Sequence, residues 1–442
     1  MRKIVICVFL FAVTAASAVN LFSLEVTLED YIKLVEKNSK QLMQAAKDVT
    51  IADATEKTVR AQAYPFIGAE AGYTRNLTDI KQQYPVASDP GSGMLIYQDI
   101  DVNTDNEFSF GLSLNQQIFN MKVFNAIKAS REYKLMTGYI YDMQKQAIIT
   151  AAKKVYYQNF LLEKLLEVKE SMEKNTYENY LNIKTKFENG LVSQFDLLRA
   201  EVDWKIKIPE TTQAKKNRDL ARVNFKNLAG IKMEEDVSLD CDIDDYPEIP
   251  VVIPLEDILK ERPDYKTLVR EQSLREINKK AALSDHYPTV TGSILYAVTA
   301  GSNTFAIDDT TNITQIGIKV SIPVFTGGAL TALDRKAAAE LEQTDIKLRQ
   351  LREDVVSEIN SIYLTLRETH ERIESAAATL DTAGRAYEIA QTSYNSGMAT
   401  QLDLKDASVS NELAGISRIS AVYEYLAAYF DWEMAIGKAA SE

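Results

Sequence analysis

The fold is decided by a stretch that the chain contains twice, FENGLVSQFDL at Phe187–Leu197 and YNSGMATQLDL at Tyr394–Leu404. Each copy has an aromatic residue and, three residues later, a glycine. Ser or Thr, Gln, an apolar residue, Asp and Leu follow at matching offsets. The two copies lie about half of the 442-residue chain apart. Self-similarity over such a separation predicts two copies of one structural unit.

Other landmarks recur in the same order along the two halves. They are Leu28-Glu29-Asp30 with Leu255-Glu256-Asp257, Tyr64-Pro65 with Tyr287-Pro288, and Phe225 before Gly230 with Trp432 before Gly437. We therefore predict a first repeat over residues 19–240 and a second over residues 255–442. The segment 241–254, CDIDDYPEIPVVIP, has three prolines and reads as the linker between them. Extra length in the first repeat falls in Leu77–Asn106, where YPVASDPGSG predicts an irregular loop.

Each repeat contains two segments of strict apolar–polar alternation, at residues 66–76 and 107–119, and at 289–299 and 313–323. In the second of these, Phe108, Phe110 and Leu112 alternate with serine and glycine. Period two predicts strands with one apolar face. Their length also suits membrane-spanning strands of ~9–11 residues. An ordinary half-buried antiparallel sheet would give the same pattern, so the strands alone leave both alternatives open.

Long helices are predicted between these strands and the repeated stretches. Met121–Glu188 has no proline and only one glycine, and would form a helix of about 100 Å at ~1.5 Å per residue. Ala329–Ser396 is equally long. Second helical runs follow at Gln194–Ala229, which Pro209 should kink or interrupt, and at Gln401–Ile436. Gly190 and Gly397 therefore mark the turns of two helical hairpins, because glycine readily adopts the left-handed backbone that ends a helix.

The N-terminus predicts export. Residues 1–18 combine Arg2 and Lys3, a short apolar core, and the small residues Ala16-Ser17-Ala18, which is typical of a cleaved signal peptide. Cys7 would leave with it and only Cys241 would remain, so we expect neither an intramolecular disulfide nor an acylated cysteine as lipid anchor.

Composition and motifs argue against several classes of function. The net charge of -13 disfavours a nucleic-acid partner. Phosphate-binding, dinucleotide-binding, CxxC and GxSxG motifs are absent from the sequence. We therefore predict that the chain has no catalytic residues, no cofactor and no metal site, and that it is not an enzyme. Four amphipathic strands cannot close a transmembrane barrel, for which about eight are needed. A membrane role would thus require several chains to pool their strands, which would also place their helices in a ring.

With its repeated helix–strand–strand–helix–helix order, the chain resembles the outer-membrane efflux proteins, the TolC-like channels. LEDILKERPD at Leu255–Asp264, PVFTGG at Pro323–Gly328 and the paired glycine turns carry the resemblance. It implies a mainly helical chain with transmembrane strands, in a homotrimer with a 12-stranded β-barrel in the outer membrane and a helical tunnel in the periplasm. Implied partners are outer-membrane lipid, a periplasmic adaptor and an inner-membrane pump or exporter. The implied function is the exit duct of a tripartite efflux or type I secretion system.

The resemblance also assigns roles at the hairpin turns. Asp403 and Asp406 match acidic residues that constrict the closed tunnel, Tyr394 matches an aromatic that links neighbouring helices, and Asp196 matches a polar partner in the first turn. Ala399 stands where the best-known relative has an arginine that helps to latch the closed state, so the latch is either absent here or replaced by Lys405. The hypothesis is a cation-preferring, poorly conducting resting pore; alternatively, both carboxylates simply favour the positive N-terminal end of a helix. Adaptor docking, or mere local packing, is expected at Gly190, Leu191, Val192, Ser193, Gly397, Met398, Ala399 and Thr400.

The main rival interpretation is a periplasmic coiled-coil adaptor or structural protein without a pore. Adaptors usually have one helical hairpin and sizeable β-domains, whereas this chain has two hairpins and four strands. Insertion of the strands into the outer membrane would separate the two interpretations.

Overall fold

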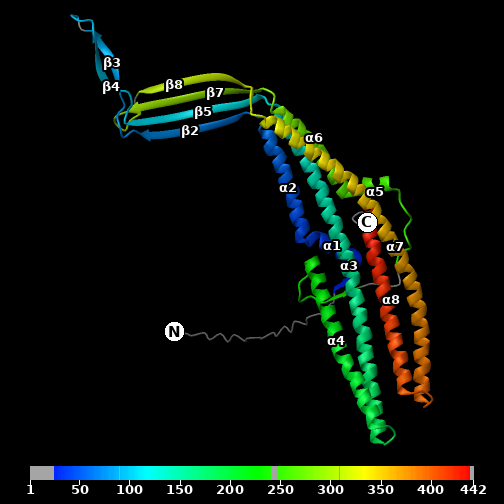
Figure 1. The fold of residues 1–442 in the computed structure, drawn as a ribbon. Helices are drawn as coiled ribbons and strands as arrows, with labels where there is room; N and C mark the ends of the chain where they lie inside the picture. Colours follow the sequence, from blue (N-terminus) through cyan, green and yellow to red (C-terminus); the bar gives the residue numbers. More distant parts are fainter. Residues whose placement is uncertain (1–23, 89, 240–245, 308, 439–442) are drawn as a thin grey trace, which may run out of the picture.

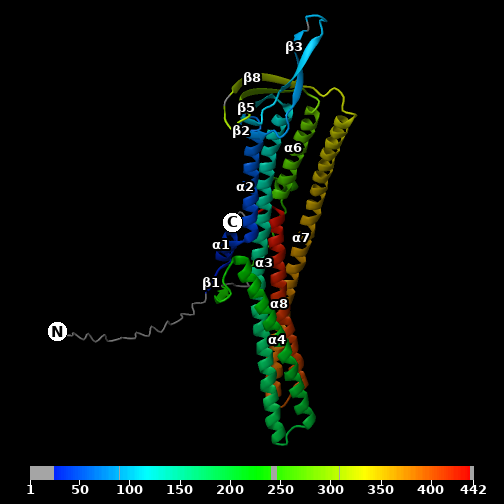
Figure 2. The same cartoon turned by 90° about the vertical axis from the view of Figure 1, so that its left-hand side faces the viewer.

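The computed structural model describes residues 24–88, 90–239, 246–307 and 309–438. The molecule is long, with a sheet at one end and two helical turns at the other (Figure 1). Helices α2 and α6 lie beside the half of α3 and α7 nearer the sheet, and α4 and α8 lie beside the other half (Figure 2). The predicted signal peptide and Cys241 lie outside the described residues.

The sheet has the antiparallel order β2-β5-β7-β8, so two strands of each repeat form one surface. β2 is Phe66–Arg75, β5 Asn106–Phe119, β7 Thr289–Ser302 and β8 Thr310–Ser321. The register brings apolar residues into rows: Ile67 pairs with Leu114, Leu114 with Ile294, and Ile294 with Ile316. The alternation seen in sequence therefore forms one continuous apolar face across all four strands.

The helical hairpins match the predicted runs closely. In the first, α3 (Met121–Glu188) begins at the N-cap Asn120, and α4 (Gln194–Ala229) returns along it. In the second, α7 (Ala329–Asn395) is followed by α8 (Gln401–Ala435). The described helices include none long and apolar enough to cross a membrane.

The helical segment before each strand pair is divided in two. The first copy gives α1 (Leu28–Asn38) and α2 (Lys40–Ala61), and the second gives α5 (Leu255–Glu261) and α6 (Pro263–Ser284). Ser39 and Arg262 are extended at the breaks, where Ser39 caps α2 and Arg262 precedes a proline.

One local prediction was wrong, and one alternative of another is excluded. Leu77–Asn106 is not irregular, because β3 (Lys81–Ser88) and β4 (Leu95–Asp101) pair as an antiparallel hairpin. The register shifts between Pro85 and Ala87, so the hairpin absorbs Pro85 at an irregularity. Helix α4 continues through Pro209, so the predicted interruption is excluded, while the alternative, a kink, stays a prediction. Pro209 is exposed, and the carbonyl that loses its helical donor there can be hydrated.

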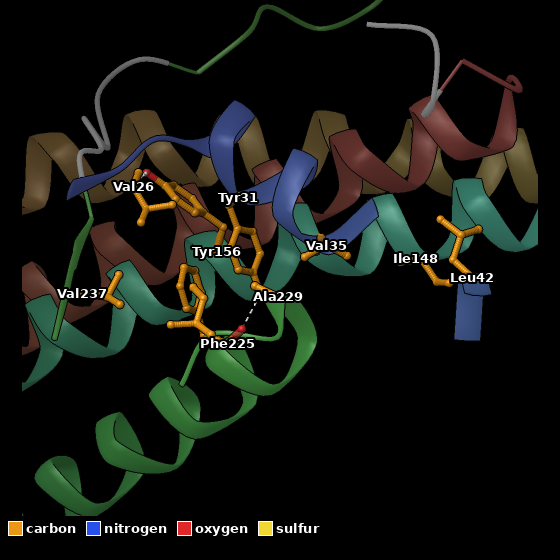
Figure 3. Packing of buried hydrophobic residues seen from close by; sticks show 11 residues of the cluster. Val26, Tyr31, Val35, Leu42, Ile148, Tyr156, Phe225, Ala229 and Val237 are labelled. Carbon is orange, nitrogen blue, oxygen red and sulfur yellow. Dashed lines mark hydrogen bonds between the residues drawn. The ribbon is translucent and has the colours of Figure 1, made fainter. Parts of the chain in front are cut away.

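A core cluster of buried hydrophobic residues lies where the N-terminal segment crosses the first hairpin (Figure 3). The ring of Tyr31 stacks on Phe225, with centroids 4.0 Å apart, and the Tyr31 hydroxyl donates to the Phe225 carbonyl at 3.1 Å. The Tyr156 hydroxyl donates to the Val26 carbonyl, beside the short parallel pair β1 (Leu24–Val26) and β6 (Val237–Leu239). These contacts hold α1, α3 and α4 together. The part of the first hairpin that lies between them and the turn at Gly190 takes no part in these contacts with α1.

Candidate functional site

Both glycine turns have the geometry that ends a helix and reverses the chain. Gly190 has φ 71° and Gly397 has φ 77°. The next amide in each turn reaches back into the preceding helix, from Leu191 to the Lys186 carbonyl at 2.9 Å and from Met398 to the Ser393 carbonyl at 2.8 Å. Left-handed glycine with this back-reaching bond is a common C-terminal motif. The two hairpin ends are thus built alike.

The conserved offsets of the two stretches are explained by capping. Ser193 and Asp196 exchange hydrogen bonds: the Asp196 carboxylate accepts from the Ser193 amide at 3.1 Å, and the Ser193 hydroxyl accepts from the Asp196 amide at 3.2 Å. Thr400 and Asp403 repeat the pattern at 2.8 and 3.2 Å. Each pair satisfies amides that a helix start leaves unpaired.

These bonds also set the charge of the two carboxylates. Hydrogen bonds from the Thr400 hydroxyl and then the Thr400 amide lower the pKa of Asp403. The Ser193 hydroxyl and amide lower the pKa of Asp196 in the same way. Both groups are therefore ionised and already engaged in capping. Asp403 has two alternative roles, constriction of the tunnel and stabilisation of a helix end. Its contacts within one chain are those of a helix end.

Asp406 differs from Asp403. Its side chain is exposed on α8, one turn further from the tip. Across the described ranges it has neither a hydrogen bond nor an ion pair to its carboxylate. It is therefore the carboxylate of the predicted pair that is free to act on ions or on another copy of the chain.

Two contacts join the hairpins near their tips; we call them the tip contacts. The Lys186 ammonium of α3 lies over the Tyr394 ring of α7, 4.7 Å from its centroid. The Lys405 ammonium of α8 lies 2.5 Å from the Asp203 carboxylate of α4. A cation over an aromatic face and a charged hydrogen bond are both attractive. Tyr394 thus links helices through Lys186, and Lys405 links the hairpins where Ala399 cannot.

An ion cluster, which consists of the buried Glu412 with Lys169, Lys207 and Glu210 around it, joins the hairpins further from the tips. Glu412 of α8 has a side chain only 2% exposed, and its oxygens lie 2.7 Å from Lys169 and 3.4 Å from Lys207. Glu210 contacts the same two lysines at 3.0 and 3.4 Å. Burial alone would lower the pKa of Lys169, but its bonds to Glu412 and Glu210 outweigh this and raise the pKa. This cluster could not be predicted from the sequence, because no local pattern shows that charges on distant helices meet.

The surface at the two hairpin turns and the start of α4 exposes more apolar residues than the docking residues predicted from the sequence. Among the predicted docking residues, Leu191 is 74% and Met398 81% exposed, whereas Val192 and Ala399 are half-buried. Ser193 and Thr400 cap helices and are not simply surface groups. The structure adds an exposed apolar stripe on α4, made of Phe195, Leu198, Val202 and Ile206. Its spacing of three or four residues could have been found in the sequence.

Comparison with known proteins decides the family. A family model described as outer membrane efflux protein matches residues 31–231 and 255–437, which is most of the chain and falls into two segments like the repeats. The chain belongs to the outer membrane efflux protein family. The resemblance drawn from the duplicated motifs is confirmed, and as a TolC-like channel protein the chain is not an enzyme.

Individual relatives of this efflux protein are distant. Over 336 residues it is 22% identical to the alkaline protease secretion protein AprF of Pseudomonas aeruginosa, covering 72% of this chain and 67% of AprF. Over 354 residues it is 22% identical to the outer membrane protein TolC of Escherichia coli, covering 77% of this chain and 71% of TolC. The crystal structure of the Campylobacter jejuni CmeC outer membrane channel superposes with a TM-score of 0.79 at 19% identity, covering 94% of this chain and 87% of CmeC. The fold predicted from sequence, mainly helical with four strands in the main sheet, is confirmed.

Proposed function

We propose that three copies of this chain form the exit duct of a tripartite efflux or type I secretion system. The observation that carries the proposal is the four-stranded sheet, which ends in two edge strands, β2 and β8, and has a continuous apolar face. β8 is exposed along its whole length in the single chain. Open edges in lipid would leave backbone groups unpaired, so copies must join edge to edge. Three copies would give the 12-stranded barrel.

The helical hairpins then form a periplasmic tunnel that closes at the tips. The tip contacts hold the two hairpins of each copy together, and three Asp406 carboxylates would face a common axis. Like charges gathered near an axis attract cations. The resting pore is therefore narrow and cation-preferring, with Asp406 as its selective group and Asp403 and Asp196 as the caps that order the turns.

The exposed apolar residues at the tips suit contact with other proteins. Leu191 and Met398 lie at the turns, where a periplasmic adaptor and an inner-membrane pump or exporter would dock. The likeness to AprF supports a protein as one class of cargo. The signal peptide predicted at residues 1–18 would direct the chain to this location.

Purified protein tests the proposal. Mass photometry should give the mass of a trimer, and planar bilayers should show a small conductance that prefers cations. Asp406→Asn should abolish the preference for cations. Asp403→Asn is the matched control, because asparagine still offers an oxygen for the cap, and it should leave the preference largely intact.

The alternatives give different results. If both variants keep the preference, the selective carboxylates lie elsewhere in the duct. If well-folded oligomers never insert into the bilayer, the chain is an adaptor or a structural protein.

A further inference from the structure

The β3–β4 hairpin projects from the end of the sheet that lies away from the helices (Figure 1). Its base is held by backbone bonds from Val102 to Ile80 at 2.9 Å and from Asn76 to Asp105 at 2.8 Å. The Asn103 side chain accepts from the Ile80 amide and donates to the Thr78 carbonyl. With eight residues in β3, the hairpin reaches about 25 Å beyond its base at ~3.3 Å per residue. In the matching connection of the second repeat, between β7 and β8, the described residues 303–307 and 309 form no such hairpin.

The two faces of the hairpin differ in charge. Cross-strand partners share a face, so the register assigns every residue except the bulged Val86. One face carries Lys81, Asp99 and Asp101. The other face, which we call the uncharged face, consists of Gln82, Tyr84, Ala87, Ile96, Gln98 and Ile100.

Among the residues that the structure describes, no segment covers the uncharged face. Ile96 is 50% exposed, Tyr84 43% and Ile100 42%, and every residue of both strands is exposed. A projecting hairpin with exposed apolar residues and unpaired edges in water is prone to association. Some surface should therefore cover this face in the working protein.

We propose that the uncharged faces of three β3–β4 hairpins pack against one another at the outer end of the duct. The proposal rests on the trimer of the proposed function. β3 continues from β2, the edge strand that would meet the next copy, so each hairpin stands at a junction between copies. The opposite face has two carboxylates against one ammonium in its strands, so packing through it would bring net negative charge together. A second copy through the uncharged face avoids that repulsion and completes a closed three-fold contact.

Single cysteines test which face is covered. Ile96→Cys lies on the uncharged face, and its neighbour Tyr97→Cys, equally exposed, lies on the opposite face. Both are made in a Cys241→Ser background and treated, as trimers verified by mass photometry, with a short bifunctional thiosulfonate. The Ile96→Cys trimer should yield covalent dimers, because a bifunctional reagent joins two of three sites, and the Tyr97→Cys trimer should stay monomeric on a denaturing gel.

Equal cross-linking of the two variants, or none in either, would overturn the proposal while leaving the trimer intact. Failure to form trimers at all would overturn the proposed function with it. In whole cells, an Ile96→Cys site that is shielded from a water-soluble maleimide yet does not cross-link would point to another component as the occupant, and would also overturn it.

A charge substitution gives an independent readout. Ile96→Asp should shorten the lifetime of the diluted trimer, because three carboxylates would be brought together, whereas Tyr97→Asp should not. Equal lifetimes in the two variants would contradict packing through the uncharged face.

Discussion

Glu412 is the group whose removal should loosen the two hairpins most. In Glu412→Gln, Lys169 and Lys207 lose the carboxylate that lies between them, although their side chains are only 21% and 17% exposed. Breaking a buried ion pair costs about 3–5 kcal/mol, because a charge remains without a partner. Glu210 stays in contact with both lysines, and glutamine keeps one acceptor oxygen, so we expect a loss near the lower end of that range.

Hydrogen exchange of backbone amides near the cluster measures this loss locally. Exchange through local opening reports the free energy of that opening. A loss of about 3 kcal/mol should speed exchange in residues 405–415 roughly 150-fold, since ~1.36 kcal/mol corresponds to a factor of ten. Amides in the central core around Tyr31 and Phe225 should keep their rates, which controls for global destabilisation.

Two further variants make the reasoning refutable. Glu210→Gln removes a carboxylate that is 37% exposed and should change exchange far less. Combining Lys169→Met, Lys207→Met, Glu210→Gln and Glu412→Leu should restore most of the protection, because it replaces the whole ion cluster and leaves no charge without a partner. If Glu412→Gln and Glu210→Gln behave alike, the buried carboxylate does not join the hairpins.

Three other predictions concern the turns and the central core. Gly397→Ala should destabilise the second turn by about 1–2 kcal/mol, because the backbone of Gly397 is left-handed, and amide exchange at the turn measures this loss. Gly138→Ala is the control inside α3, where open space surrounds the glycine; it should stabilise the protein slightly, as thermal unfolding would show. Because the pKa of Asp403 is lowered below 3.8, its cap should be intact above that pH and lost as the pH falls through the lowered value. Amide exchange at the tip should become faster as the cap is lost, and Asp403→Asn should remove this dependence on pH. Tyr31→Phe should lower the free energy of unfolding by about 1 kcal/mol through loss of the bond to the Phe225 carbonyl, and an unchanged unfolding temperature would contradict this.

Much of the architecture could be predicted because its determinants are local. Long helices without proline end at glycines, and strands alternate with period two, so α3 and α4 have the predicted bounds. The duplication then relates the second half to the first. Family membership follows from the order of these elements, since each motif by itself is common.

The errors arose where local signals conflict with their context. Pro85 and the glycines near it predict a loop, yet pairing with β4 makes a hairpin that contains a bulge. Pro209 predicts a kink or a break, yet packing along α3 keeps the helix continuous. The gate role of Asp403 stays a prediction from the resemblance, and the capping box that Thr400 forms with Asp403 is compatible with it. Contacts such as Glu412 with Lys169 depend on the crossing of distant helices, which no single segment encodes.

The central claim is that the joined hairpins close a membrane duct at its tips. Single-channel conductance of the purified protein, compared with a Lys186→Ala, Lys405→Ala double variant, tests it most directly. Loss of both tip contacts should raise the conductance severalfold in a protein that still forms trimers. Unchanged conductance in that variant, or the absence of any channel in either protein, would contradict the account.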